Sequence, residues 1–350
     1  MPLQQLVQDF IVTFTSILYE AMPFIVLGAV ISGVLEELVP QQWIAKIVPR
    51  NRVLAISLSA LLGLVFPMCE CGIVPVMRRL LRKGLPLGCC CAYLLAGPII
   101  NPVVILSTAV AFQAPDDPTL VAAFAAGRGQ LITVLRVLGG FIVAVLTALI
   151  VERAYRKHGY SLLTPLARPN APLPSENDVP PPSASESPAE AHFEEEEETG
   201  VRPSAWKRLA NISETALHDF VDITVFLILG ALLAATARMF FTHSDIENLS
   251  TSYPVVIILA MMGLAILLCL CSEADAFVAA SFTSMPPAAK LAFLVLGPML
   301  DIKLYVMYTR VFRPRLIFTI FSSVIVLTLI YSLIIHQIWL AVRPTVTPTG

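Results

Sequence analysis

Two Cys-x-Cys pairs, Cys69/Cys71 and Cys269/Cys271, lie 200 positions apart in this chain of 350 residues. Thiolates are soft ligands that suit Cu(I), Zn(II) or a trivalent metalloid, so the four cysteines are candidate ligands for a soft ion or a thiophilic solute. The alternative interpretation is plain packing, because cysteine is common among small buried residues. The spacing predicts no definite metal site and no cofactor.

Charged side chains interrupt the apolar segments near the cysteine pairs. A charge that faces lipid at the bilayer midplane costs about 2.5–3.5 kcal/mol, so such residues are expected to pair or to face a cavity. Asp301 and Lys303 form a candidate ion pair in this polar core. Glu273 and Asp275 are candidates for proton coupling, because a carboxylate in a dry cavity can take up and release protons. A purely structural network of buried charges is the alternative.

Proline and glycine break the apolar segments beside these residues. The predicted helix breaks are Pro67, Pro75, Gly97, Pro98, Gly297 and Pro298. Backbone groups that are freed partway across a membrane must be buried in protein or line a wet cavity, and half-helix ends supply partial charges for an ion or a polar solute. We therefore expect broken helices to meet near the midplane around one site. The candidate substrate-binding residues of this site are Cys69, Glu70, Cys71, Asn101, Cys269 and Cys271.

The breaks and the cysteines belong to an internal repeat. Residues 60–98 share ten identities with residues 260–298, including both Cys-x-Cys pairs and both Gly-Pro steps. The chemistry is not repeated, because Asn101 corresponds to Asp301. We therefore expect two copies of similar architecture, of which the second handles most of the charge and the first shapes the cavity. A duplicated segment of this kind is typical of a transporter whose site lies between its repeats.

Composition indicates an all-α integral membrane protein. The chain is 57% hydrophobic and 14% charged, against about 25% charged residues in soluble domains. Its mean hydropathy is +0.78. No basic stripe suggests nucleic acid as a partner, and no nucleotide-binding or hydrolase motif suggests an enzyme. All seven cysteines lie in apolar segments, which disfavours a secreted disulfide framework.

Each half of the chain contains four apolar segments, which predicts eight transmembrane helices. An even number of passes per half would make the repeats parallel. If residues 119–151 form two passes, the total becomes ten and the repeats are inverted. Both arrangements stay open at this point.

The predicted organisation has four parts, which are a first membrane repeat (1–152), a linker (153–205), a second membrane repeat (206–342) and a tail (343–350). The linker contains eight prolines between Pro165 and Pro188 and a run of five glutamates, so it is expected to be disordered. The simplest interpretation is that it joins the halves, and a regulatory or metal-sensing role is the minority one.

Lysine and arginine predict the orientation. In the arrangement of eight helices, the basic cluster at 78–83 and both linker ends share one side with the two termini. We therefore predict a cytoplasmic linker and cytoplasmic termini. No lysine or arginine precedes Lys46, so no cleaved signal peptide is predicted.

Four motifs carry a family resemblance: FPMCECGIVPVMRRLLRKGLP, LAGPIINP, CLCSEADAFVAASF and LGPMLDIK. Together they resemble the bacterial permease family of YraQ and ArsP type, over both membrane halves and excluding the linker. The resemblance implies a multi-pass permease of the cytoplasmic (inner) membrane. Some relatives are associated with efflux of trivalent arsenicals, which implies arsenical resistance and places the four repeated cysteines near the substrate path.

Three hypotheses follow. The first is a secondary transporter for efflux of a small thiophilic solute such as a trivalent arsenical, driven by protons. The second is a transmembrane thiol–disulfide oxidoreductase, or a permease for an unrelated small anion. The third is a membrane subunit whose partner supplies the activity. The predicted partners are the lipid bilayer and a small-molecule or metalloid substrate, and a homo-oligomer is left open.

Overall fold

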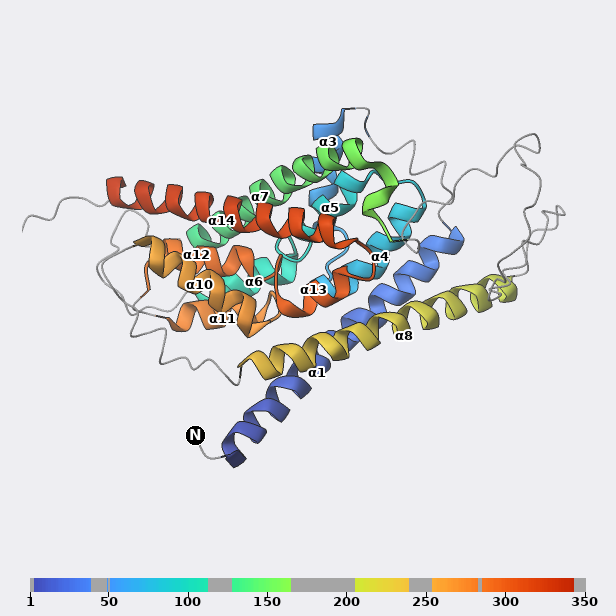
Figure 1. Ribbon diagram of the computed structural model, residues 1–350, viewed down its shortest axis with the longest axis horizontal. Coiled ribbons are helices and arrows are strands. Elements are labelled where there is room, and N and C mark those ends of the chain that lie inside the picture. Colours follow the sequence, from blue (N-terminus) through green and yellow to red (C-terminus); the bar gives the residue numbers. More distant parts are fainter. Residues whose placement is uncertain are drawn as a thin grey trace, which may run out of the picture.

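The computed structural model describes residues 3–38, 49, 51–112, 128–164, 205–238, 254–282 and 285–342. These residues are almost entirely helical, apart from a short backbone pairing between Leu163 and Phe312. Figure 1 shows the helices gathered into one elongated bundle. The predicted all-α membrane fold is confirmed. Most of the predicted linker and the whole predicted tail lie outside the described residues.

Four long helices frame the bundle. They are α1 (Leu3–Leu38), α7 (Arg128–His158), α8 (Ala205–Arg238) and α14 (Pro314–Val342). Each contains an apolar stretch of 27 to 29 residues, which is long enough to cross a hydrocarbon core of about 30 Å. Large apolar side chains remain exposed along them, such as Leu233 and Phe318, as expected of a surface that faces lipid.

The shorter helices come in pairs, and a break of five residues separates the two members of each pair. In the first half, α3 (Arg52–Ala60) continues into a 3-10 turn, η1 (Leu61–Leu64), before α4 (Glu70–Arg82), and α5 (Leu87–Ala96) precedes α6 (Pro102–Ala111). In the second half, α10 (Pro254–Leu268) precedes α11 (Ala274–Ser281), and α12 (Pro287–Leu296) precedes α13 (Ile302–Tyr308). The short 3-10 turn η2 (Gly159–Leu162) follows α7.

The predicted breaks at Pro67 and at the two Gly-Pro steps are confirmed, but the prediction for Pro75 is wrong. Pro75 lies inside α4, which begins at Glu70 and continues to Arg82. A proline there removes a single backbone hydrogen bond, the one to the carbonyl four residues earlier. The buried packing of α4 outweighs that loss, since nearly every residue from Glu70 to Leu81 is buried.

The first pair of short helices forms a re-entrant hairpin. A Cβ built on Gly88 would touch Ile56, and one on Gly63 would touch Gly97, so α3 runs parallel to α5. Helix α4 then returns to the side where α3 began, where Lys83 donates a hydrogen bond to the carbonyl of Glu36 near the end of α1. This hairpin therefore enters and leaves on one side.

The second pair crosses the bundle as one interrupted helix. Gly88 at the start of α5 donates a backbone hydrogen bond to Glu152 near the end of α7. Thr108 in α6 accepts one from Arg136 near the start of α7. The pair α5/α6 therefore lies antiparallel to α7 along most of its length.

The second half repeats this arrangement in the opposite orientation across the bundle. Figure 1 shows the end of α7 and the beginning of α8 toward one end of the bundle, and the beginning of α1 and the end of α14 toward the other. Gly230 packs against Lys303, and Arg310 binds Asp222, so α13 runs antiparallel to α8. The hairpin α10/α11 lies at the opposite end of the bundle from α3/α4.

The described chain thus passes from one side to the other six times, three times in each repeat, with one re-entrant hairpin per repeat. The predicted eight or ten passes are corrected, because two apolar segments turn back instead of crossing. An odd number of passes makes the repeats inverted, which decides the alternative that the sequence left open. Helix α1 begins and α14 ends on one side of the bundle, here called the termini side. Helix α7 ends and α8 begins on the other, here called the linker side, and this path differs from the predicted shared side of linker and termini.

This topology gathers the basic residues. The described lysines and arginines at helix ends on the linker side are Arg52, Arg82, Lys83, Arg153, Arg156, Lys157, Arg208, Arg310, Arg313 and Arg315. In the arrangement of eight helices, several of them would have lain on the side opposite the linker. The corrected topology removes that conflict with the positive-inside rule.

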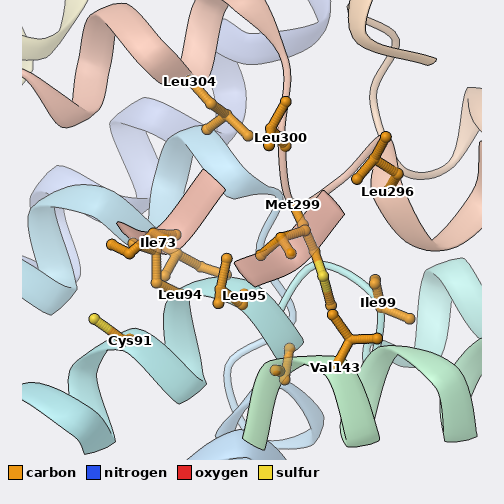
Figure 2. Close-up of a cluster of buried hydrophobic side chains, with 14 of the residues drawn as sticks. Ile73, Cys91, Leu94, Leu95, Ile99, Val143, Leu296, Met299, Leu300 and Leu304 are labelled. Atoms are coloured by element: carbon orange, nitrogen blue, oxygen red, sulfur yellow. The ribbon is translucent and has the colours of Figure 1, made fainter. Parts of the chain in front are cut away.

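An apolar cluster fills the centre, where the Gly-Pro breaks of the two repeats meet. Figure 2 shows Ile99 next to Val143 and the side chain of Met299, with Leu296 and Leu300 nearby. All of these residues are at most 3% exposed. The breaks are therefore sealed by side chains in this conformation.

Reporter fusions test the topology. An alkaline phosphatase fusion after Gly350 and a second one inserted between residues 165 and 204 should give opposite results, because phosphatase folds only outside the cytoplasm. Green fluorescent protein at the same two positions should give the reverse pattern. Equal activity at both positions would contradict the inverted topology.

Gly63 and its repeat counterpart Gly263 allow a controlled test of how closely the chain packs at the breaks. A Cβ on Gly63 would lie 2.7 Å from the backbone of Gly97 and of Ile100, whereas one on Gly263 would meet nothing within 4 Å. Gly63→Ala should therefore lower the free energy of unfolding by about 1–3 kcal/mol. Gly263→Ala should be neutral or stabilising by up to ~1 kcal/mol, because alanine favours helix. Thermal unfolding of the detergent-purified protein measures both, and equal effects would exclude the close approach.

Candidate functional site

The half-helices that follow the breaks meet in crossed pairs. Helix α4, which follows the first Cys-x-Cys pair, packs against α13 of the second repeat. Helix α11, which follows the second pair, packs against α6 of the first repeat. The fold therefore makes two related places, the α4–α13 junction and the α6–α11 junction. Each lies where N-terminal helix ends of both repeats come together.

Lys303 is the centre of the α4–α13 junction. Its ammonium lies 2.8 Å from Oε1 of Glu70 and 3.4 Å from Oδ2 of Asp301. It also donates to the carbonyls of Cys269 and Leu270, at 3.3 and 3.4 Å. Glu70, Asp301 and Lys303 are each at most 3% exposed. One buried ammonium thus contacts both repeats. The predicted Asp301–Lys303 pair is present, and the carboxylate of Glu70 lies closer to Lys303 than that of Asp301 does.

The charge in this junction is unbalanced. Two carboxylates face one ammonium, and Oε2 of Glu70 has no hydrogen-bond partner among the described residues. An uncompensated carboxylate in a dry interior is costly, so the arrangement favours a further positive charge or a proton beside Glu70.

The two Cys-x-Cys pairs flank the same ammonium. Cys69 and Cys71 lie on either side of Glu70, and their side chains interact with each other. The carbonyl of Cys269 contacts Lys303, while Cys271 is partly exposed. All the cysteines are free thiols, and the described residues contain no group of three His, Cys, Asp or Glu side chains that could hold a metal ion.

The third cysteine group lies elsewhere. Cys89, Cys90 and Cys91 are buried in α5, at most 1% exposed, and Figure 2 shows Cys91 among apolar neighbours. Their surroundings support the packing interpretation for this group.

Arg136 of α7 is the centre of the α6–α11 junction. Its guanidinium donates to the hydroxyl of Thr108 at 2.7 Å and to the carbonyl of Ser272 at 2.9 Å. Oδ2 of Asp275 lies 4.0 Å from it, and the same oxygen would be 2.7 Å from a Cβ on Gly297. The second Gly-Pro break therefore leaves just enough room for the Asp275 carboxylate.

The candidates Asn101, Asp301 and Glu273 have identifiable contacts. Asn101 and Asp301 are the N-caps of α6 and α13, and they accept backbone hydrogen bonds from Val103 at 2.9 Å and Leu304 at 2.6 Å. Each therefore has a structural task in addition to any role in a site. Glu273 is half-buried, with one carboxylate oxygen 3.4 Å from the hydroxyl of Ser272.

Arg136 was not among the predicted site residues, although it is only 1% exposed. The signal was present, because an arginine within the apolar run 119–151 meets the criterion that singled out Glu273 and Asp275. The expectation that the second copy handles most of the charge stays a prediction. The second copy contributes Glu273, Asp275, Asp301 and Lys303 to the two junctions, and the first contributes Glu70 and Arg136.

An ion cluster ties the repeats together between the junctions and the linker side. Arg78 of α4 binds Asp219 and, at 2.8 Å, Asp222, both on α8. Arg79 binds Asp219 at 3.1 Å, and Arg310 binds Asp222 at 2.6 Å. We call these five residues the inter-repeat ion cluster. Arg78 and Arg79 are at most 8% exposed, so they are buried partners and not the loop charges that the orientation prediction assumed.

A small hollow, with room for about one water molecule, lies beside this cluster. Its lining residues are Val74, Arg78, Ile223, Phe226, Met307, Arg310 and Val311. These residues come from α4, α8 and the α13 region, so the hollow lies between the repeats.

Comparison with known proteins agrees with this architecture. Residues 6–337 match the ArsP_1 family, described as predicted permeases. The UPF0718 protein YcgR of Bacillus subtilis is 35% identical over 92% of this chain and 95% of its own length. A Streptococcus mutans protein, named as a subunit of a two-component membrane permease complex, is 30% identical over 92% of this chain and 93% of its own length.

The UPF0718 protein YraQ of Escherichia coli is 22% identical over 83% of this chain and 70% of its own length. No solved structure matches the chain. With matches that cover nearly all of both repeats, this chain belongs to the ArsP_1 family of predicted permeases.

Proposed function

We propose that this membrane permease is a secondary transporter whose solute crosses at the two junctions between its inverted repeats. The observation that carries the proposal is the buried ammonium of Lys303, held between Glu70 of one repeat and Asp301 of the other. Buried ionisable groups at helix breaks are expensive, and they mark solute or ion pathways in membrane proteins. A rocking motion of one repeat against the other would expose such a site to each side in turn.

The solute that fits best is small and thiophilic, with trivalent arsenicals as the leading class and efflux as the direction. Cys69 and Cys71 lie beside the ammonium, and Cys269 and Cys271 approach from the other repeat. A monomethylated arsenous diol would react with two protonated thiols: two As–S bonds form, two As–O bonds break, and the thiol protons leave with the hydroxyls as two waters, with no net proton released. Capture by two thiols agrees with the absence of a three-ligand group among the described residues.

Proton coupling is supported by the charge count at the junctions. Four carboxylates, those of Glu70, Glu273, Asp275 and Asp301, face the two cations Lys303 and Arg136. Protons taken up on one side would neutralise the surplus and leave on the other. The alternative of a small-anion permease would instead use the two cations as the anion site.

The basic helix ends support a cytoplasmic linker side in the bacterial inner membrane. In this proposed orientation α1 begins and α14 ends on the outer side. The inter-repeat ion cluster would act as the cytoplasmic lock, because it links α4 to α8 and to the segment after α13, beside the hollow between the repeats. Its repeat counterparts Val278, Val110 and Glu20 cannot form such a cluster, so the lock belongs to one side.

A second candidate function is that of a subunit in a two-component permease complex, which the printed name of the Streptococcus mutans relative favours. Purification from native membranes with a stoichiometric partner would support it. The thiol–disulfide oxidoreductase stays a prediction, which alkylation trapping of Cys69 and Cys71 in cells would test.

Transport by proteoliposomes tests the substrate and the cysteines. The wild-type protein should move methylarsenite faster than empty liposomes, and more so under a pH gradient. Cys71→Ser should abolish this transport, whereas Cys91→Ser, a buried packing cysteine of α5, should retain it. Glu273→Gln should remove the response to the pH gradient. Unchanged flux across a panel of soft metals and metalloids would exclude the thiophilic substrate.

Asp219→Asn tests the cytoplasmic lock. Asp219 is fully buried and binds both Arg78 and Arg79, so the change leaves two buried cations short of a counter-charge. We expect a loss of about 3–5 kcal/mol in unfolding free energy. Glu36→Gln is the matched control, since its carboxylate is half-exposed and 3.6 Å from Arg79, and should change stability by only about 0–1 kcal/mol.

The same variants report on access. Asp219→Asn should speed maleimide labelling of a cysteine placed at Met307, which lines the hollow, while Glu36→Gln should not. Equal labelling rates and equal thermal midpoints for the two variants would show that the inter-repeat ion cluster does not keep the hollow closed.

A further inference from the structure

The surroundings of the Lys303 ammonium are those of a metal-cation site. Four oxygens lie within 3.4 Å of Nζ, two from carboxylates and two from backbone carbonyls. An ammonium has only three protons to donate, so it is offered more acceptors than it can bind singly. Carbonyls at an unwound helix end, joined by carboxylates, are the ligands that bind Na⁺ in transporters with broken helices.

The oxygens are positioned by features other than Lys303. Asp301 is fixed as the N-cap of α13 by its hydrogen bond from Leu304. The carbonyls of Cys269 and Leu270 follow directly after the end of α10, where terminal carbonyls lack intrahelical partners. Cys269 has a φ of 48°, a left-handed conformation that a residue with a side chain adopts only under strain, and its carbonyl contacts Lys303.

An independent observation points to a ligand at the same place. Glu70 is 1% exposed, and its Oε2 has no hydrogen-bond partner among the described residues although Oε1 contacts Lys303. The junction thus contains a carboxylate oxygen that the ammonium leaves unpaired. The ligand set is confined to this junction, because the repeat counterparts of Glu70, Asp301 and Lys303 are Leu270, Asn101 and Val103.

We propose that Lys303 is a tethered substitute for a monovalent metal cation, and that Glu70, Asp301 and the carbonyls of Cys269 and Leu270 form a latent Na⁺ site which its ammonium keeps occupied. Because the Lys303 ammonium is part of the chain, the junction has its positive charge without binding Na⁺ from solution. Removal of the ammonium leaves two facing carboxylates and two free carbonyls, a shell that a hard monovalent cation can enter.

Thermal unfolding in two salts tests this inference. Lys303→Met should show a saturable rise in its thermal midpoint as NaCl replaces choline chloride at constant ionic strength and pH. The wild-type protein should show no difference between the salts. Lys303→Met combined with Asp301→Asn should lose most of the Na⁺ response, because one of the two carboxylates is neutralised.

Lys290→Met is the matched control, since Lys290 lies on α12 over the ring of Phe112, away from the junction. It should respond to the two salts as the wild type does. If Lys303→Met responds equally to Na⁺ and choline, the proposal is overturned. If the variant is recovered in NaCl and not in choline, that yield difference supports it, and failure to recover it in either salt shows that Na⁺ cannot replace the ammonium.

The experiment measures Na⁺ binding through stability and not through transport. Its failure would therefore leave the proposed transport of a thiophilic solute untouched. In the same way, an absence of arsenical flux would not bear on the latent Na⁺ site.

Discussion

The contact between Lys303 and Glu70 is the interaction on which the centre of this permease depends. It spans 2.8 Å between two repeats that are inverted relative to each other, and both side chains are at most 3% exposed. A buried ion pair is weak support for stability, since desolvation offsets much of its attraction. It is strong support for register, because a helix shift that separated the pair would leave charges uncompensated. The ammonium therefore fixes how α4 meets α13.

The backbone imposes a second constraint that explains why charge gathers at these places. Each break frees carbonyls and amides within an apolar bundle, and each must find a partner. Asn101 and Asp301 cap the half-helices that follow the Gly-Pro steps. Lys303 and Arg136 donate hydrogen bonds to backbone carbonyls of the segment between α10 and α11. In the proposed transport site, the same polar groups that make broken helices tolerable would also contact the solute.

Much of this arrangement could be predicted from the sequence, because the signals are local. The repeat, the Gly-Pro breaks and the apolar runs are properties of neighbouring residues, and all three are present in the structure. The direction of the chain after a break is not local. Pro67 and Pro75 look alike in sequence, yet α4 continues through Pro75 and the chain turns back before it, because packing against α1 and α5 decides the path. Counting apolar segments therefore overestimated the number of passes.

The asymmetry between the repeats is a consequence of inversion and not an accident of composition. Inverted repeats present equivalent helices to opposite sides, so a residue pair can lock one side only if its repeat counterparts have diverged. Arg78 and Asp222 bind on the linker side, whereas their counterparts Val278 and Glu20 could form no ion pair on the termini side. The same reasoning applies at the centre, where Lys303 serves one junction and Arg136, from a different helix, serves the other. The two repeats share a backbone plan but not their charges, so in the proposed transport cycle the two sides would be held closed by different interactions.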